Sequence, residues 1–333
     1  METKILTTSD EDIKTAAYII KSGGLVVFPT ETVYGLGADA FNESAVKNVY
    51  AAKGRPSDNP MIVHIGRASD IGSLTPELND TIVKLIDNFW PGPLSLVVKK
   101  KPVVPGAVTG GLDTVAVRMP DDAAALALIK EAGCPIAAPS ANISGSPSPT
   151  KPAHVIRDLD GKVDAIIAGG DCRVGIESTV LDVTCDMPVI LRPGIITAED
   201  IKAVIGAEVK LDPALLSGAQ NDADIKPRSP GMKYKHYAPR AEMAVIEGQR
   251  EKVKSEIERL KKLNEGLGNR VGVILFEEKA FREAAHDFFA ELRELDEQGA
   301  DIIFAGALSE TDGVGFAVMN RMMKSAGYRV IKV

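Results

Sequence analysis

Residues 25–37 read LVVFPTETVYGLG, and this stretch sets the architecture of the first half of the chain. Its first four residues, Leu25 to Phe28, are branched or aromatic, which is typical of a short buried strand. From Pro29 onward the stretch combines hydroxyls, a carboxylate and glycines, which a mere connection between elements does not need. The pattern predicts a buried strand followed by a loop that carries chemistry.

Similar short apolar runs recur on both sides of this stretch and alternate irregularly with amphipathic segments. Further strands are predicted at 61–65, 95–98, 114–118, 165–167, 179–183 and 189–191. Helices are predicted at 10–22, 42–52, 76–89, 120–132 and 197–205, with Asn42 and Thr197 as helix starts. Short strands mixed with helices, without strict alternation, predict an α/β domain with a mixed sheet over residues 1–209.

The texture changes twice after this domain. Residues 210–240 are crowded with Pro, Gly, Asn and Asp, which break regular elements and predict a linker or a functional lid. Residues 241–333 then alternate cleanly, with strands at 242–247, 271–276, 301–305 and 328–333 and helices at 250–263, 279–295 and 313–326. This alternation predicts a small parallel, Rossmann-like sheet with crossover helices.

Composition narrows the class of protein. The 333 residues are 45% hydrophobic and 26% charged, which excludes a disordered or disulfide-stapled chain. The formal net charge of −7 disfavours a dedicated nucleic-acid coat or a membrane-surface binder. The three cysteines have no metal-ligand spacing, the start of the chain is no signal peptide, and no apolar run approaches the roughly 18–20 residues of a membrane span. We expect a cytoplasmic protein that contacts no membrane.

Cations, hydroxyls and amides gather at the predicted strand ends of the first domain. They are Lys53 and Arg55 on a Gly/Pro turn, Asn59, His64, Arg118, Ser140, Asn142, Ser178 and Arg192. Such a set suits a polyanion that carries a polar head. Each residue also has a structural interpretation, because loop cations are usually solvated, a strand histidine is often a satisfied core residue, and S-x-N often forms an Asx turn.

Two nucleotide-binding motifs are excluded or weak. There is no G-x-x-x-x-G-K-[ST] sequence, so any phosphate site is not a P-loop. Residues 35–40 match G-x-G-x-x-A, but six residues separate Phe28 from Gly35, and Asp58 precedes its strand instead of ending it. A nicotinamide-dependent dehydrogenase is therefore disfavoured.

Taken together, the loop motifs carry a family resemblance. PTETVYGLG, KGRP, NPMIVH, WPGP, APSANISG, ESTV and LRPG follow one another between residues 29 and 194, and SPGMKYKHYAP follows at 229–239. In this order they resemble the threonylcarbamoyl-AMP synthases of the YrdC family, in the long form with a C-terminal domain. The resemblance implies a twisted mixed sheet and a reaction of L-threonine, bicarbonate or CO2, and ATP that gives threonylcarbamoyl-AMP and pyrophosphate.

The resemblance also implies roles for individual residues. Around threonine it places Thr32, His64, Arg118, Ala138 and Ser178. Around ATP it places Lys53, Arg55, Asn59, Thr114, Ser140, Asn142, Ser148 and Arg192, with Tyr234 of the linker closing the site. Lys53 and Arg55 would stabilise the departing pyrophosphate. Mg²⁺ would arrive with ATP, since no metal-ligand spacing is present, and the product would pass to a tRNA-modifying transferase.

Two other functions remain open at this stage. One is an RNA-binding module with a positive concave face, although the net charge of −7 limits any tRNA contact to a weak one. The other is a carbamoyl or acyl transferase acting on a different amine. For the C-terminal domain, the sequence leaves open regulation, partner docking or anchoring of the linker.

Overall fold

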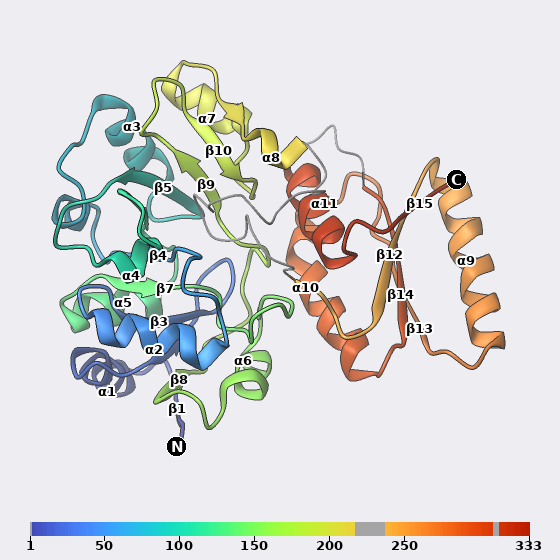
Figure 1. Cartoon of the computed structure of the whole chain (residues 1–333), viewed down its shortest axis with the longest axis horizontal. Helices are drawn as coiled ribbons and strands as arrows, with labels where there is room; N and C mark the ends of the chain where they lie inside the picture. Colours follow the sequence, from blue (N-terminus) through green and yellow to red (C-terminus); the bar gives the residue numbers. More distant parts are fainter. Residues whose placement is uncertain (1, 217–236, 309–312) are drawn as a thin grey trace.

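The computed structural model describes residues 2–216, 237–308 and 313–333, and it has two lobes that lie side by side (Figure 1). The strands of the first lobe are β1 (Lys4–Leu6), β2 (Val26–Phe28), β3 (Gly35–Asp39), β4 (Ile62–His64), β5 (Leu94–Lys99), β6 (Thr114–Arg118), β7 (Ile136–Ala138), β8 (Ala165–Ile167), β9 (Thr179–Asp182), β10 (Val189–Arg192) and β11 (Lys210–Leu211). Its helices are α1 (Asp10–Lys21), α2 (Glu43–Lys53), η1 (Ala68–Ser73), α3 (Asp80–Phe89), α4 (Gly106–Thr109), α5 (Ala123–Ala132), α6 (Pro152–Leu159), α7 (Ala198–Ile205) and α8 (Pro213–Leu216).

The strands of the first lobe form one 11-stranded sheet in the order β1-β8-β2-β3-β7-β4-β6-β5-β9-β10-β11. Neighbours are parallel in some pairs, such as β4 with β6, and antiparallel in others, such as β2 with β3. The prediction of an α/β fold with a mixed sheet is therefore confirmed. No helix among the described residues has both the length and the apolar character needed to cross a bilayer.

Helix ends follow the capping signals. The side chain of Asn42 accepts a hydrogen bond from the Ala45 amide at 3.1 Å, so α2 begins where the sequence predicts. Two predicted starts are wrong, because the first capping side chain comes later than Pro76 and Pro120. Asn79 caps α3 and Asp122 caps α5, and those helices begin only at the next residue.

The stretch after β2 corrects one expectation. The sequence predicts a loop from Pro29 to Gly37, but its last three residues belong to β3, which pairs antiparallel with β2. A Cβ at Gly37 would lie 2.5 Å from a methyl carbon of Ile136 and 2.7 Å from the Phe28 ring. Glycine here allows close approach within a sheet and not a turn. The composition of residues 210–216 likewise predicts irregular structure, yet they contain β11 and α8, which Pro213 begins.

The two faces of the large sheet pack differently. Alternate residues of one strand point to opposite faces, so Val63 belongs to the main core with α2 and α3, whereas Ile62 belongs to a small patch on the other face with Val97 and Ala116. α1 and α5 cover that second face where Leu6 of β1 and the apolar residues of β2, β7 and β8 lie. By the same alternation His64 and Arg118 share the face of Ile62 and Ala116.

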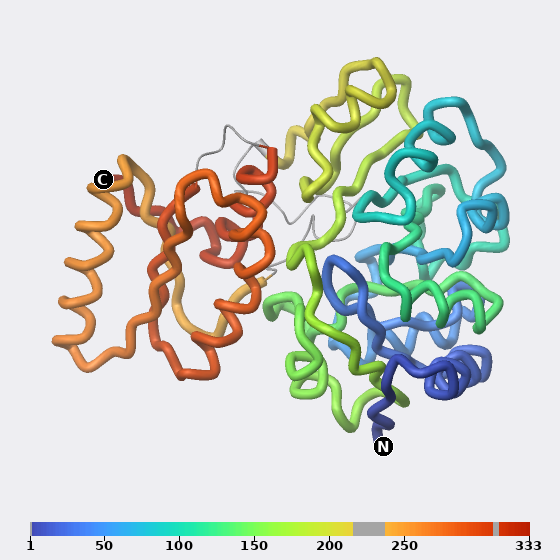
Figure 2. Tube along the Cα trace, turned by 180° about the vertical axis from the view of Figure 1, so that it is seen from behind, coloured from blue at the N-terminus to red at the C-terminus, as the bar shows by residue number. Residues whose placement is uncertain are grey.

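The second lobe is an all-parallel sheet in the order β13-β14-β12-β15, as the sequence predicts. Its elements are β12 (Glu242–Glu247), α9 (Arg250–Gly266), β13 (Val271–Ile274), α10 (Phe281–Glu297), β14 (Ile302–Gly306), α11 (Gly313–Ser325) and β15 (Val330–Lys332). Two opposite views show α10 and α11 beside the first lobe and α9 on the far side (Figures 1 and 2).

One continuous core joins the two lobes. Val33, Ile176 and Ile195 of the first lobe are buried in the same cluster as α10 and α11. Gly175 lies against α10 so closely that a Cβ there would be 2.3 Å from the carbonyl oxygen of His286. The second lobe thus packs directly against the first through buried apolar side chains.

Candidate active site

A pocket lies where the polar ends of several strands of the first lobe meet. Its lining residues are Thr30, Thr32, Val33, Tyr34, Gly35, Arg55, Ile62, His64, Arg118, Ala138, Pro139, Ser140, Asn142, Ser144, Gly145, Ser146, Glu177, Ser178, Arg192 and Tyr237. His64 and Arg118 are direct register partners at the carboxyl ends of the parallel strands β4 and β6. Ile62, His64, Arg118 and Ala138 lie on one face of the sheet. Thr30, Ser140, Ser178 and Arg192, from adjoining loops and strand ends, line the same pocket.

Arg118 is buried and held on three sides. Its Nε donates to the Gly92 carbonyl at 3.1 Å, and its Nη1 donates to the Thr32 hydroxyl at 2.9 Å. Its Nη2 lies 2.5 Å from an oxygen of Glu31, which is equally buried. A guanidinium has five N–H groups in a rigid fork, so this one can grip the wall and still face an anion in the pocket. Glu31 is therefore the counter-ion of Arg118.

His64 is a neutral imidazole. Burial, reinforced by the positive charge of Arg118, lowers the pKa of His64 to about 3. Its Nδ1 is buried and has no hydrogen-bond partner among the residues that the structure describes. The ring of Phe28 packs edge-on against it, with ring centroids 5.8 Å apart. A neutral, unpartnered ring nitrogen in a pocket wall is suited to accept a hydrogen bond from a ligand.

Arg192 and Ser178 form a second anchored pair. The Nε of Arg192 donates to the Ser178 carbonyl and its Nη2 donates to the Ser178 hydroxyl, both at 3.0 Å. The Ser178 hydroxyl also lies 2.8 Å from that of Ser95. Burial lowers the pKa of Arg192 to about 10, so this side chain remains a cation at neutral pH. It therefore adds a second fixed positive charge to the pocket.

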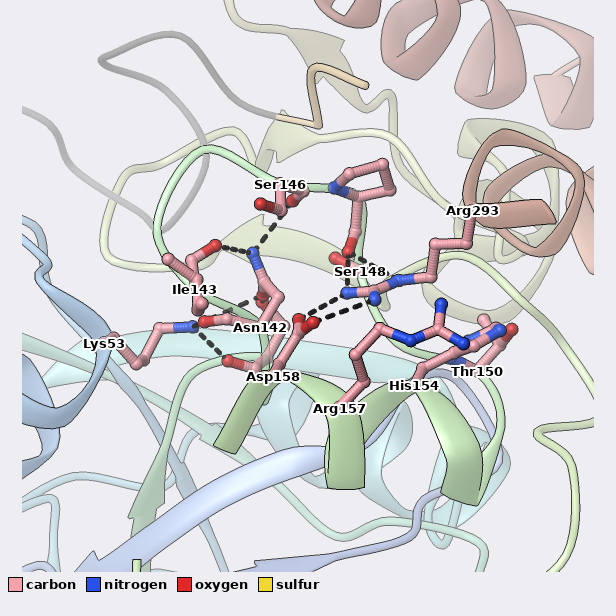
Figure 3. A network of polar contacts seen from close by, with 12 residues as sticks. Lys53, Asn142, Ile143, Ser146, Ser148, Thr150, His154, Arg157, Asp158 and Arg293 are labelled. Atoms are coloured by element: carbon pink, nitrogen blue, oxygen red, sulfur yellow. Dashed lines mark hydrogen bonds and ion pairs between the residues drawn. The ribbon is translucent and has the colours of Figure 1, made fainter. Parts of the chain in front are cut away.

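Lys53 lies behind the pocket wall and not in it. Its Nζ donates to the carbonyls of Ser140 and Asn142, and the Asn142 side-chain oxygen lies 3.3 Å away (Figure 3). An ammonium has three N–H donors, and these three loop oxygens match them. Burial lowers the pKa of Lys53, and Arg55 lowers it further. Contact of Lys53 with a triphosphate stays a prediction; what the structure shows is a clamp on the loop.

The other predicted residues divide in the same way. Thr32, Arg55, His64, Arg118, Ala138, Ser140, Asn142, Ser178 and Arg192 line the pocket together. Asn59 is fully buried and does not line the pocket, and its side-chain amide has no hydrogen-bond partner among the described residues. Thr114 begins β6 on the same face as Arg118 and is not among the lining residues, so its contact with ATP stays a prediction. Tyr234 lies outside the described residues.

One part of the site comprises Ser148, Glu177 and Tyr237. Of these three, the family resemblance gives a role to Ser148 alone. Glu177 is buried, accepts a hydrogen bond from the Ser148 hydroxyl at 2.5 Å and pairs with Arg321 of α11 at 3.1 Å. Burial opposes its ionisation, but Arg321 and Arg192 outweigh burial and lower the pKa of Glu177. Tyr237 packs on Phe289, with ring centroids 5.1 Å apart. The ESTV motif marks Glu177, but Arg321 has no local signal.

The arrangement favours anion binding over proton transfer. Three arginines line the pocket together with hydroxyls and an amide, and Glu177, the carboxylate among the lining residues, is already engaged. Among the described residues, no three His, Cys, Asp or Glu side chains gather as metal ligands. An Mg²⁺ that is held by nucleotide phosphates and water needs no such cluster, so the lining is compatible with it.

Each of the two lobes matches a known protein family. A family model of the Sua5, YciO and YrdC proteins, described as "Telomere recombination", matches residues 18–194. A second, described as "Threonylcarbamoyl-AMP synthase, C-terminal domain", matches residues 196–327. Threonylcarbamoyl-AMP synthase of Pyrococcus abyssi is 49% identical over 96% of both chains. The Bacillus subtilis protein of that name is 48% identical over 98% of this chain and 96% of its own.

One solved structure extends this similarity to three dimensions. The crystal structure of P. abyssi Sua5 complexed with L-threonine has a TM-score of 0.93 at 48% identity, covering 99% of this chain and 100% of that one. Both lobes and their arrangement are therefore shared.

Proposed function

The chain belongs to the Sua5/YrdC family of threonylcarbamoyl-AMP synthases, and on that premise we propose that it converts L-threonine, bicarbonate or CO2, and ATP into threonylcarbamoyl-AMP and pyrophosphate. It is an ATP-using enzyme that transfers an adenylyl group. The observation that carries the proposal is one pocket whose wall joins Arg118 and His64 to Arg55 and Arg192. Two anions, a carboxylate and a triphosphate, have matching cations there.

We assign the threonine half of the pocket to the ends of β4 and β6. Arg118 binds the amino-acid carboxylate, since its fork matches two carboxylate oxygens. Thr32 and Ser178 contact the substrate hydroxyl, which selects threonine over an amino acid that would leave them unpaired. The neutral His64 accepts a hydrogen bond from the substrate amine, which must lose a proton before it attacks CO2. Ala138 leaves room for the side-chain methyl group.

The ATP half comprises Arg55, Arg192 and the loop from Ser140 to Ser148. The threonine amine nitrogen forms a bond to the carbon of CO2 and gives up one proton to solvent, which produces the carbamate. One carbamate oxygen then attacks the α-phosphorus while pyrophosphate leaves in line. Such a step depends on positioning and charge neutralisation more than on proton transfer. Arg55 and Arg192 neutralise the phosphates. Lys53 holds the first part of the loop, and Ser148 ties its end to Glu177. The side chains of Asn59 and Thr114 remain proposed ATP contacts. Mg²⁺ bound to the phosphates supplies further charge neutralisation.

The pocket also shelters the intermediates from water. A carbamate and a mixed anhydride both decompose in water, so the pocket that holds them must exclude solvent. The walls meet this need, because Arg118, His64, Ser178 and Tyr237 are each nearly inaccessible to solvent. We further propose that the product passes to a tRNA-modifying transferase in the cytoplasm, where any contact with tRNA is weak.

Pyrophosphate release tests the proposal. The full-length protein, given ATP, Mg²⁺ and bicarbonate, should release pyrophosphate in a threonine-dependent manner. Serine should substitute poorly and valine worse, because valine leaves the polar partners Thr32 and Ser178 unpaired. Mass spectrometry should detect threonylcarbamoyl-AMP. Release that is independent of threonine, or equal with valine, would contradict the assignment.

A further inference from the structure

The loop between β7 and α6 is held at three points: by Ala238 just before β12, by Arg293 of α10 and, through Glu177 of the first lobe, by Arg321 of α11. The Ala238 amide donates to the Gly145 carbonyl at 2.8 Å. Arg293 of α10 donates to the carbonyl of Pro147 from Nε at 3.1 Å and from Nη2 at 2.6 Å. The hydroxyl of Ser148 donates to Glu177, whose other carboxylate oxygen pairs with Arg321 of α11.

Arg293 links this loop to α6 as well. Its Nη1 and Nη2 donate to the two oxygens of Asp158 at 3.2 and 2.7 Å, and both side chains are buried at the boundary between the lobes (Figure 3). Lys53 holds the Ser140–Asn142 end of the same loop from α2. The loop is therefore fixed between a cation of the first lobe and a cation of the second.

Arg321 acts on the neighbouring strand ends. Its side chain is fully buried, and besides Glu177 it donates to the carbonyl of Pro193. Pro193 follows Arg192, and Glu177 precedes Ser178, which bonds to Arg192. A guanidinium that bridges two segments fixes their separation, because its donors lie in one rigid plane. Arg321 thus supports Ser148 and Arg192 together from behind the pocket.

We propose that the second lobe is a positioning component of the ATP half of the site, and that Arg293 and Arg321 are its positioning residues. Neither residue lines the pocket. They act through the Gly145–Ser148 segment, Glu177 and Pro193 on groups that face the nucleotide. The inference rests on the proposed function, since it takes the loop from Ser140 to Ser148 as the ATP side.

The proposal is tested by removing two contacts of Arg293 separately: its hydrogen bonds to the Pro147 carbonyl and its ion pair with Asp158. Asp158→Asn removes the ion pair but leaves the Arg293 donors on Pro147. Arg293→Met combined with Asp158→Asn removes both and strands no buried charge. We expect the single variant to stay within twofold of wild type in every constant. The double variant should raise the ATP KM tenfold or more, with the threonine KM changed less than twofold. Arg293→Lys combined with Asp158→Asn, which restores one donor toward Pro147, should recover part of the loss.

A matched control addresses the docking of the lobes in general. Glu297 lies one helical turn after Arg293 and pairs with Arg157 of α6, away from the loop. Glu297→Gln should therefore leave both KM values unchanged. Arg321→Lys, which keeps a cation beside Glu177 but loses the rigid fork, should raise the ATP KM about two- to fivefold with the threonine KM unchanged.

The measurements are steady-state pyrophosphate release, ATP affinity by calorimetry on the full-length chain, and the melting temperature. Equal ATP constants for Asp158→Asn and the double variant would overturn the inference, as would equal rises in both KM values. Wild-type protein without threonine-dependent release would instead contradict the proposed function. The ATP affinities of the same variants would then still decide the role of Arg293.

Discussion

Arg118→Lys separates the two substrates and gives a magnitude that can be worked from the structure. The native guanidinium contacts Gly92, Thr32 and Glu31 at once, whereas one ammonium at the same place keeps the charge and reaches Glu31. The variant loses two internal hydrogen bonds, at about 0.5–1.5 kcal/mol each, and therefore about 1–3 kcal/mol of the free energy of unfolding. It leaves Glu31 paired, so the fold should survive.

The effect on threonine should be larger than the effect on stability. The variant also loses one charge-assisted hydrogen bond to the substrate carboxylate, which contributes about 1.5–3 kcal/mol, or roughly 10- to 100-fold in kcat/KM for threonine. The ATP KM should change less than about threefold, because Arg118 belongs to the threonine half.

Steady-state pyrophosphate release with each substrate varied in turn measures the two constants, and urea unfolding measures stability. Arg192→Lys is the matched counterpart. Arg192, like Arg118, is a buried arginine of the pocket, and it makes two hydrogen bonds to Ser178. It should raise the ATP KM instead. The reasoning fails if Arg118→Lys raises both KM values equally, or if the two variants show the same pattern.

Three further predictions follow from individual contacts. The pKa of His64 is about 3 in the folded chain and near 6.5 in the unfolded chain, so between these pH values only the unfolded chain binds the proton. The urea midpoint of unfolding should therefore fall as the pH drops below about 6.5. His64→Gln should make this fall smaller. Arg55→Ala should lower kcat/KM for ATP roughly 100-fold or more with an unchanged circular dichroism spectrum, and normal turnover would remove Arg55 from the ATP site. Gly175→Ala should lower the melting temperature, because the new Cβ would lie 2.3 Å from the His286 carbonyl oxygen and because residue 175 has a φ of +82°. Gly170→Ala is the control: a Cβ there meets no atom within 4 Å, so the melting temperature should not change.

The second lobe illustrates how the sequence pattern and packing contribute different information. Clean alternation of strands and helices predicts its parallel sheet, and the structure has that sheet. No pattern indicates that α10 and α11 share a core with Val33 and Ile176, or that Arg293 and Arg321 reach the loop beside the pocket. Those two arginine contacts join residues more than 140 positions apart, which no local periodicity records.

Features that depend on residues close together in the chain could be predicted from the sequence alone. Capping side chains such as Asn42 and Thr197, a left-handed glycine such as Gly133, and runs of branched residues act locally, so most helix ends and strands could be predicted. The ordered loop motifs likewise identified the family. Local signals failed where a residue serves a distant partner, as at Gly37, whose missing side chain makes room for Phe28 and Ile136.

The tertiary structure alone decided which polar residues meet. His64 and Arg118 become neighbours because β4 and β6 pair in parallel register. A one-residue slip of either strand would turn that strand's side chain to the other face of the sheet. Burial then distinguishes cations that look alike in the sequence: Arg55 lines the pocket, whereas Lys53 is enclosed by loop oxygens. An ionic group takes its role from the dielectric and the partners around it, and both are properties of the folded chain.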